Sequence, residues 1–182
     1  MKKYFAIFGM ILFSSAMLQI NNVYADKVYA SRKAKPGNEI ALKNYVCADD
    51  LLNFAQTLIG IRYRSASSSP LHGFDCSGFV CYVFKNFNFD VPRSSCEFID
   101  VGEKVTLENA KPGDVILFTG TSKRSRKIGH VAIVMTNDAD SDLTFIHSTS
   151  GKEHGVTITT MDKRYKRRFV QIIRLLKQNN QG

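Results

Sequence analysis

The strongest constraint on the fold is the order of two kinds of pattern: helical patterns come first along the chain and strand patterns come later. Residues 45–60 carry apolar side chains at helical spacing and end at Gly60, and a second helical pattern begins at residue 76. Five later segments have the short alternating or β-branched patterns of strands: 109–120, 128–135, 143–149, 155–160 and 168–176. This order predicts an α+β domain in which N-terminal helices pack on a central antiparallel β-sheet.

The second helical segment has a polar N-terminus and an apolar body. Its apolar residues fall at helical spacing, which predicts a buried helix: Phe79, Val80, Val83, Phe84 and Phe87. The preceding stretch "GFDCSGFV" (73–80) places either Asp75 or Cys76 in the N-terminal cap region.

Cys76 is a candidate nucleophile because of this position. The unpaired N–H groups and the partial positive charge of a helix N-terminus stabilise a thiolate, and a neighbouring imidazolium stabilises it further. Ser77 and Gly78 are small, so a substrate carbonyl can approach the first-turn N–H groups, which can act as an oxyanion hole. The common alternative for a free cysteine is a buried structural role. Cys76 therefore needs a base nearby to be catalytic.

Two histidines in neighbouring strand segments are the candidates for that base. In "IGHVAIVM" (128–135), alternation places four residues on one face: Ile128, His130, Ala132 and Val134. In "LTFIHST" (143–149), His147 shares a face with Leu143 and Phe145, and the turn-rich residues 136–142 predict a hairpin between the two strands.

A specific register would bring the two histidines together. If residue 134 pairs with residue 143, then His130 pairs with His147, with their Cβ atoms about 5 Å apart. A slip of one residue would move one of them to the other face. The predicted arrangement is a relay in which His130 is the base for Cys76 and His147 orients His130.

Other roles for the histidines and cysteines are less well supported by the sequence. His72 and His154 lie in predicted loops, and the sequence places no third ligand beside His130 and His147, so neither a metal site nor a cofactor is expected. If Cys76 is a free thiol, three cysteines remain: Cys47, Cys81 and Cys96. One disulfide plus one buried thiol, or three buried thiols, are both open.

The N-terminus has the layout of a secretory signal peptide. Lys2 and Lys3 precede an apolar run, and Val23-Tyr24-Ala25 matches a small-x-small cleavage site, so residues 1–25 are predicted to be removed. The apolar run is shorter than the ~20 residues that a spanning helix needs. We expect an exported protein, in the periplasm, cell envelope or extracellular space, with a polar linker at 26–44, a catalytic domain at 45–178 and no transmembrane segment after cleavage.

The formal charge of +9 is concentrated in two basic runs at 122–127 and 162–168. Such runs are commonly solvated surface, and the functional alternative is attraction to an anionic envelope polymer. Nucleic acid is not an expected partner, because no zinc-finger, helix-turn-helix or aromatic RNA-binding signature accompanies the charge. We expect a monomer.

The three motifs "GFDCSGFV", "IGHVAIVM" and "FIHSTS" resemble those of the NlpC-type family of papain-like cell-wall cysteine peptidases, and of its Spr-like murein endopeptidases in particular. Three flanking stretches fit the same family: "TLIGIRYR", "VPRSSCEFIDVGEKV" and "AKPGDVILF". The resemblance covers residues 47 to 176. It implies a papain-like fold and hydrolysis of peptidoglycan stem peptides at the bond between γ-linked D-glutamate and a diamino acid.

The resemblance also implies roles for individual residues. Cys76 matches the nucleophile, His130 the base and His147 the polar residue that orients it, while Tyr63 matches a tyrosine that helps to hold the oxyanion. Four residues match positions that line the substrate groove: Asp75, Ser77, Arg93 and Ser94. A carboxylate and hydroxyls suit that role, because stem peptides carry amines and carboxylates.

The sequence departs from the family pattern in two places. Residues 65–70, "SASSSP", replace a usual Tyr-Gly-Gly, and a basic insertion, "TSKRSRK" (121–127), precedes His130. Both changes concern substrate contacts and leave the catalytic residues in place. The alternatives are an amidase or acyltransferase with the same Cys-His-His set, or a non-catalytic wall-binding module.

Overall fold

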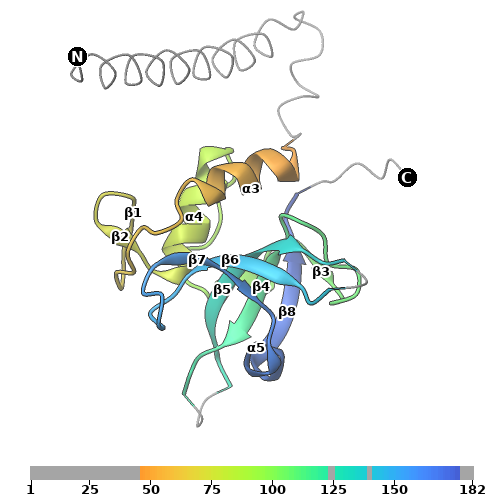
Figure 1. The fold of residues 1–182 in the computed structure, drawn as a ribbon. Helices are drawn as coiled ribbons and strands as arrows, with labels where there is room; N and C mark the ends of the chain where they lie inside the picture. Colours follow the sequence, from red (N-terminus) through yellow and green to blue (C-terminus); the bar gives the residue numbers. More distant parts are fainter. Residues whose placement is uncertain (1–45, 123–125, 139–140, 177–182) are drawn as a thin grey trace, which may run out of the picture. The chain divides into compact units, whose positions relative to one another are not determined.

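The computed structural model describes residues 46–122, 126–138 and 141–176, and the predicted signal peptide and linker lie outside this range. Helices and short strands come first: α3 (Ala48–Gln56), β1 (Ser68–Ser69), β2 (Gly73–Phe74), α4 (Cys76–Asn86) and the 3₁₀ helix η1 (Glu97–Asp100). The larger strands follow: β3 (Glu103–Val105), β4 (Val115–Thr119), β5 (Ile128–Thr136), β6 (Thr144–Ser148), β7 (Val156–Thr160) and β8 (Phe169–Arg174), with α5 (Lys163–Arg168) before β8 (Figure 1).

The six larger strands form one antiparallel sheet in the order β3-β8-β4-β5-β6-β7, and β1 and β2 form a separate small hairpin. This confirms the predicted α+β class, including all five predicted strands. No helix in the described ranges is long and apolar enough to cross a membrane.

Each face of the sheet covers its own apolar core. Along β4, Val115 and Leu117 point into the core shared with α3 and α4, whereas Ile116 and Phe118 point into a second core that includes Tyr165 of α5. These four of the five β4 side chains are completely buried. Period-two alternation in a strand that is buried on both sides produces this division. Figure 1 shows α3 and α4 together on one side of the sheet and α5 near the end of β4 and β8.

Asp75, one of the two residues predicted for the N-terminal cap region, caps α4. The Asp75 carboxylate accepts a 2.7 Å hydrogen bond from the backbone N–H of Gly78. The loop before β1 packs tightly against this first turn, because a Cβ atom on Gly78 would lie 2.1 Å from the carbonyl oxygen of Ser67. A glycine at position 78 lets the loop and the helix approach each other this closely.

The predicted register of β5 and β6 is wrong by two residues. Val134 pairs with Phe145, not with residue 143, and an irregularity follows before Thr136 pairs with Thr144. Because side-chain direction repeats every two residues, this shift keeps His130 and His147 on the same face.

The face predicted for Ile128 is also wrong. The β4–β5 ladder shifts between Phe118, which pairs with His130, and Thr119, which pairs with Ile128. The extra residue in β5, Gly129, turns Ile128 towards the core of α3 and α4.

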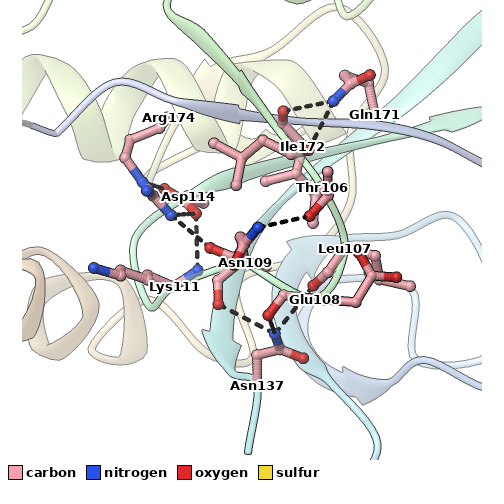
Figure 2. Close-up of polar contacts among 12 residues, drawn as sticks. Thr106, Leu107, Glu108, Asn109, Lys111, Asp114, Asn137, Gln171, Ile172 and Arg174 are labelled. Carbon is pink, nitrogen blue, oxygen red and sulfur yellow. Dashed lines mark hydrogen bonds and ion pairs between the residues drawn. The ribbon is translucent and has the colours of Figure 1, made fainter.

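The loop between β3 and β4 is tied to the sheet by a buried ion pair (Figure 2). Arg174 of β8 donates from Nε and Nη2 to the two carboxylate oxygens of Asp114, at 2.9 and 2.7 Å, and Asp114 is completely buried. The amide of Asn137 donates to the carbonyl oxygens of Leu107 and Ala110, both at 3.1 Å. These contacts close the turn that the Pro112-Gly113-Asp114 stretch predicts.

Candidate active site

A cleft of about 330 Å³ lies where the start of α4, the start of β5, the β6–β7 loop and α5 meet. It brings together three predicted site residues: Tyr63, Cys76 and His130. Its other lining residues are Thr121, Gly129, Thr149, Ser150, Gly151, Arg164, Tyr165 and Arg168. A larger cavity of about 460 Å³, between residues 103–111 and Arg174, shares none of these residues.

Cys76 is the first residue of α4 and is partly buried at the wall of the cleft. Burial raises the pKa of its thiol above the ordinary value, and a hydrogen bond from the backbone N–H of Val131 acts in the opposite direction. Asp75, the capping carboxylate, raises the pKa further. Backbone hydrogen bonds from Ser77 and Cys76 lower the pKa, as expected at a helix N-terminus, but burial outweighs them. The neutral thiol is therefore favoured, and a base must remove its proton.

His130 and His147 form a hydrogen-bonded pair. Nε2 of His130 lies 2.7 Å from Nδ1 of His147, and Nε2 of His147 lies 2.9 Å from the hydroxyl oxygen of Thr159 on β7. The two rings are nearly perpendicular, with centroids 4.9 Å apart. Both ring nitrogens of His147 take part in these hydrogen bonds, and so does Nε2 of His130. Only Nδ1 of His130 is therefore left to exchange a proton with a group in the cleft.

Both imidazoles are held in the neutral form. Burial lowers the pKa of His147 to about 4, with further lowering by the positive charges of Arg168 and Arg164. Burial also holds the pKa of His130 well below its usual value, and His147 and Arg168 add to the effect. A neutral His130 is the form that can accept a proton from a thiol.

Tyr165 forms an aromatic wall beside the pair, and the sequence analysis missed it. Its ring centroid lies 6.4 Å from that of His130 and 5.9 Å from that of His147. Arg164 and Arg168 stack on the same ring, with guanidinium carbons 5.2 and 5.4 Å from its centroid. Tyr165 lies in the basic run 162–168, for which the sequence predicts either solvated surface or a polymer-binding patch. The missed signal was Asp162, which caps α5 by accepting from the N–H of Tyr165.

Thr159 was also missed, because a threonine in an alternating strand carries no distinctive signal. It pairs with Phe145 in the β6–β7 ladder, two residues from Thr157, which pairs with His147. Only the pairing of β6 with β7 brings its hydroxyl to the histidine.

Tyr63 lies on the wall of the cleft that Cys76 also lines. Burial raises the pKa of its phenol, and the nearby thiol of Cys76 raises it further, so the hydroxyl stays protonated and can donate a hydrogen bond. The backbone holds this residue through a 2.8 Å bond from the N–H of Tyr63 to the carbonyl oxygen of His154.

Asp75, Ser77 and Arg93 form a hydrogen-bonded cluster at the start of α4. Arg93 donates to both Asp75 oxygens, at 2.9 and 2.6 Å, and to the hydroxyl of Ser77 at 2.9 Å. Asp75 and Ser77 are buried, and none of the three lines the cleft. Ser94 follows this cluster, with its hydroxyl 3.1 Å from the sulfur of Cys96 and also outside the cleft lining. Their contact with substrate stays a prediction.

Cys47 and Cys96 are exposed, and Cys76 and Cys81 are partly buried. All four cysteines are free thiols in this structure, and Cys81 contacts the carbonyl oxygen of Pro92 at 3.0 Å. Within the described ranges, no group of three or more His, Cys, Asp or Glu side chains is placed to hold a metal ion.

Comparison with known proteins identifies relatives that share this region. The sequence model of the NlpC/P60 family matches residues 60–174. The chain is 36% identical over 115 residues to the γ-DL-glutamyl hydrolase of Bacillus subtilis, and the alignment covers 62% of this chain and 26% of that protein. It is 34% identical over 123 residues to the murein DD-endopeptidase MepS/murein LD-carboxypeptidase of Escherichia coli, covering 66% of this chain and 58% of the relative.

A solved structure supports the same assignment of fold. The crystal structure of an NlpC/P60 family protein from Bacillus cereus superposes with a TM-score of 0.64 at 29% sequence identity, over 74% of this chain and 43% of the other. The alignments thus cover between about a quarter and three fifths of the lengths of these relatives.

Proposed function

Because the chain belongs to the NlpC/P60 family, we propose that it is an exported cysteine endopeptidase that hydrolyses peptidoglycan stem peptides between γ-linked D-glutamate and a diamino acid. The observation that carries the proposal is the shared cleft: Cys76 and His130 line it together, and His130 is hydrogen-bonded to the buried His147. The printed names of the relatives, a γ-DL-glutamyl hydrolase and a murein endopeptidase, support the choice of bond and polymer.

The hydrogen-bonded chain of imidazoles defines which proton His130 can take. If His147 donates from Nε2 to Thr159, its Nδ1 accepts from Nε2–H of His130, and Nδ1 of His130 is then unprotonated. In the opposite tautomer Nδ1 of His130 carries a proton and cannot act as a base. Thr159 therefore favours catalysis when its oxygen accepts from His147.

Acyl transfer then proceeds in two stages. Nδ1 of His130 takes the thiol proton as the sulfur of Cys76 attacks the glutamyl carbonyl carbon, and the resulting imidazolium donates that proton to the departing amine. Water, deprotonated by His130, next hydrolyses the thioester and releases the glutamyl carboxylate. The hydroxyl of Tyr63 and the first-turn N–H groups of α4 hold the oxyanion in both stages.

Asp75, Ser77, Arg93 and Ser94 are proposed to bind charged groups of the stem peptide at the edge of the cleft. Residues 1–25 are proposed to direct export to the periplasm or cell envelope, residues 26–44 to be a linker, and residues 45–178 to be the catalytic domain of a monomer. The basic runs are proposed to attract anionic envelope polymers.

A cleavage assay tests the proposal directly. The protein lacking residues 1–25 is incubated with purified muropeptides under reducing conditions, beside a Cys76→Ala control, and the products are identified by mass spectrometry. We expect products cut after D-glutamate with the first protein and none with the control. Absence of cleavage by a folded, reduced protein would reject the peptidase function, and transfer of the glutamyl group to an added amine would favour an acyltransferase.

A further inference from the structure

The active-site cleft is positively charged, which the proposed chemistry does not by itself require. Its lining includes two arginines, Arg164 and Arg168, and no aspartate or glutamate. The two histidines of the site are neutral, since their pKa values are lowered. The lining therefore carries a net positive charge, and the carboxylates of Asp162 and Glu153, which act on Tyr165, lie outside it. Such a cleft favours a ligand that carries a negative charge.

The two arginines differ in whether their guanidinium groups are hydrogen-bonded. Arg168 is partly buried and donates from Nε and Nη2 to the backbone oxygen of Thr119, at 2.9 and 2.7 Å, so its guanidinium is committed to the sheet. Arg164 is exposed, and within the described residues its guanidinium has only the stacking contact with Tyr165 and no hydrogen bond or ion pair. Its five N–H donors are therefore available to a ligand.

The remaining charges of α5 show that this state is particular to Arg164. Lys166 pairs with Asp142 at 2.6 Å, outside the cleft lining. Lys163 and Arg167 are exposed and do not line the cleft. Arg164 is thus the side chain of α5 that combines an uncommitted cation with a place in the cleft.

Arg164 lies on the histidine side of the cleft. It stacks on Tyr165, whose ring contacts both histidines, and its charge lowers the pKa of His147. In thiol-dependent acyl transfer the departing amine must receive its proton from His130, so the leaving group lies against the histidine side. Arg164 consequently faces the leaving group, whereas Tyr63 and Cys76 face the acyl group.

We propose that Arg164 is a specificity-determining residue that binds a carboxylate on the leaving group, so that the cleft selects a diamino acid with a free side-chain carboxylate, diaminopimelate, over lysine. This inference rests on the proposed function, in which the leaving group is a diamino acid. A guanidinium can bind the carboxylate in a bidentate manner. Lysine has no such carboxylate and presents an ammonium group to the arginine.

The test compares three synthetic tetrapeptides, L-Ala-γ-D-Glu-X-D-Ala. X is meso-diaminopimelate, the same residue with its distal carboxylate amidated, or L-lysine. In each tetrapeptide the α-carboxyl of X is in a peptide bond, so only the side-chain carboxylate differs. The kcat/KM of each peptide is measured for the wild type, for Arg164→Gln and for the matched control Arg167→Gln, and circular dichroism checks that each variant is folded.

We expect the wild type to prefer the free carboxylate over the amidated form by about 10–100-fold, the range for one hydrogen-bonded charge pair. The ratio should fall towards one in Arg164→Gln and persist in Arg167→Gln. Equal rates on the first two peptides in the wild type, or an unchanged ratio in folded Arg164→Gln, would overturn the inference while leaving the proposed function in place. No cleavage of any peptide would reject the proposed function and the inference with it.

Discussion

Nε2 of His130 lies 2.7 Å from Nδ1 of His147, although the two residues are not paired in the β5–β6 ladder. The rings meet diagonally across the strands, and Tyr165 covers both of them. His147 is completely buried, so its ring is held by packing as well as by its hydrogen bonds to His130 and Thr159. This series of contacts fixes the orientation of the His130 ring.

The hydroxyl of Thr159 should act as a positioning group for the histidine pair. In Thr159→Val, Nε2 of His147 loses its partner, which favours the tautomer that protonates Nδ1 of His130. We expect kcat to fall by about 10-fold, in line with the loss of one net hydrogen bond, and to be largely restored in Thr159→Ser. Steady-state kinetics on a muropeptide with a pH profile measures this. An unchanged kcat and an unchanged profile in Thr159→Val would contradict it.

The acid limb of the activity profile should lie below pH 6.5, the ordinary pKa of histidine. The active form needs neutral imidazoles, and the pKa of His147 is lowered to about 4 while that of His130 is well below its usual value. Protonation therefore begins only as the pH falls well under 6.5. A plot of kcat/KM against pH, with folding monitored at each pH, checks this, and a limb at or above pH 6.5 would show that the pair is not held neutral.

The ion pair between Asp114 and Arg174 should be important for stability. Asp114→Ala leaves a partly buried guanidinium without its carboxylate and removes the acceptor of the Lys111 N–H. We expect the free energy of unfolding to fall by about 3 kcal/mol. Urea denaturation measures it.

A matched control for this variant is Asp142→Ala, which breaks the exposed pair with Lys166. That variant should lose less than about 1 kcal/mol. Equal losses in the two variants would show that burial of Asp114 is not what makes its ion pair important.

Gly78 should not tolerate a side chain. In Gly78→Ala the new Cβ would lie 2.1 Å from the carbonyl oxygen of Ser67, which itself accepts a 2.9 Å bond from the N–H of Asp75. The loop or the first turn of α4 must move, and we expect a loss of about 1–3 kcal/mol in stability together with reduced kcat/KM, because Cys76 lies on that turn. In the control Gly120→Ala the nearest neighbour of the new Cβ is the Cα of Gly129, 3.9 Å away. Thermal unfolding that is equal for both variants would argue against a steric role for Gly78.

Local patterns in the sequence were sufficient to predict most of the elements. Helical spacing and a polar start predicted α4 with either Asp75 or Cys76 in its cap region, and alternation predicted β5 and β6 with both histidines on one face. These features depend on near neighbours in the chain, so they can be read locally. The same is true of the Cys76 position, which follows from the helix start.

The tertiary structure decided which of these residues meet and in what electrostatic state. The β5–β6 register, in which Val134 pairs with Phe145, makes the contact of the histidines diagonal, and sequence periodicity cannot distinguish registers that differ by an even number. Burial of Cys76 raised its pKa, against the expectation from the helix N-terminus alone. Tyr165, Thr159 and Arg164 joined the site only through the packing of α5 and β7, because contacts between distant segments depend on the whole fold and leave no local pattern.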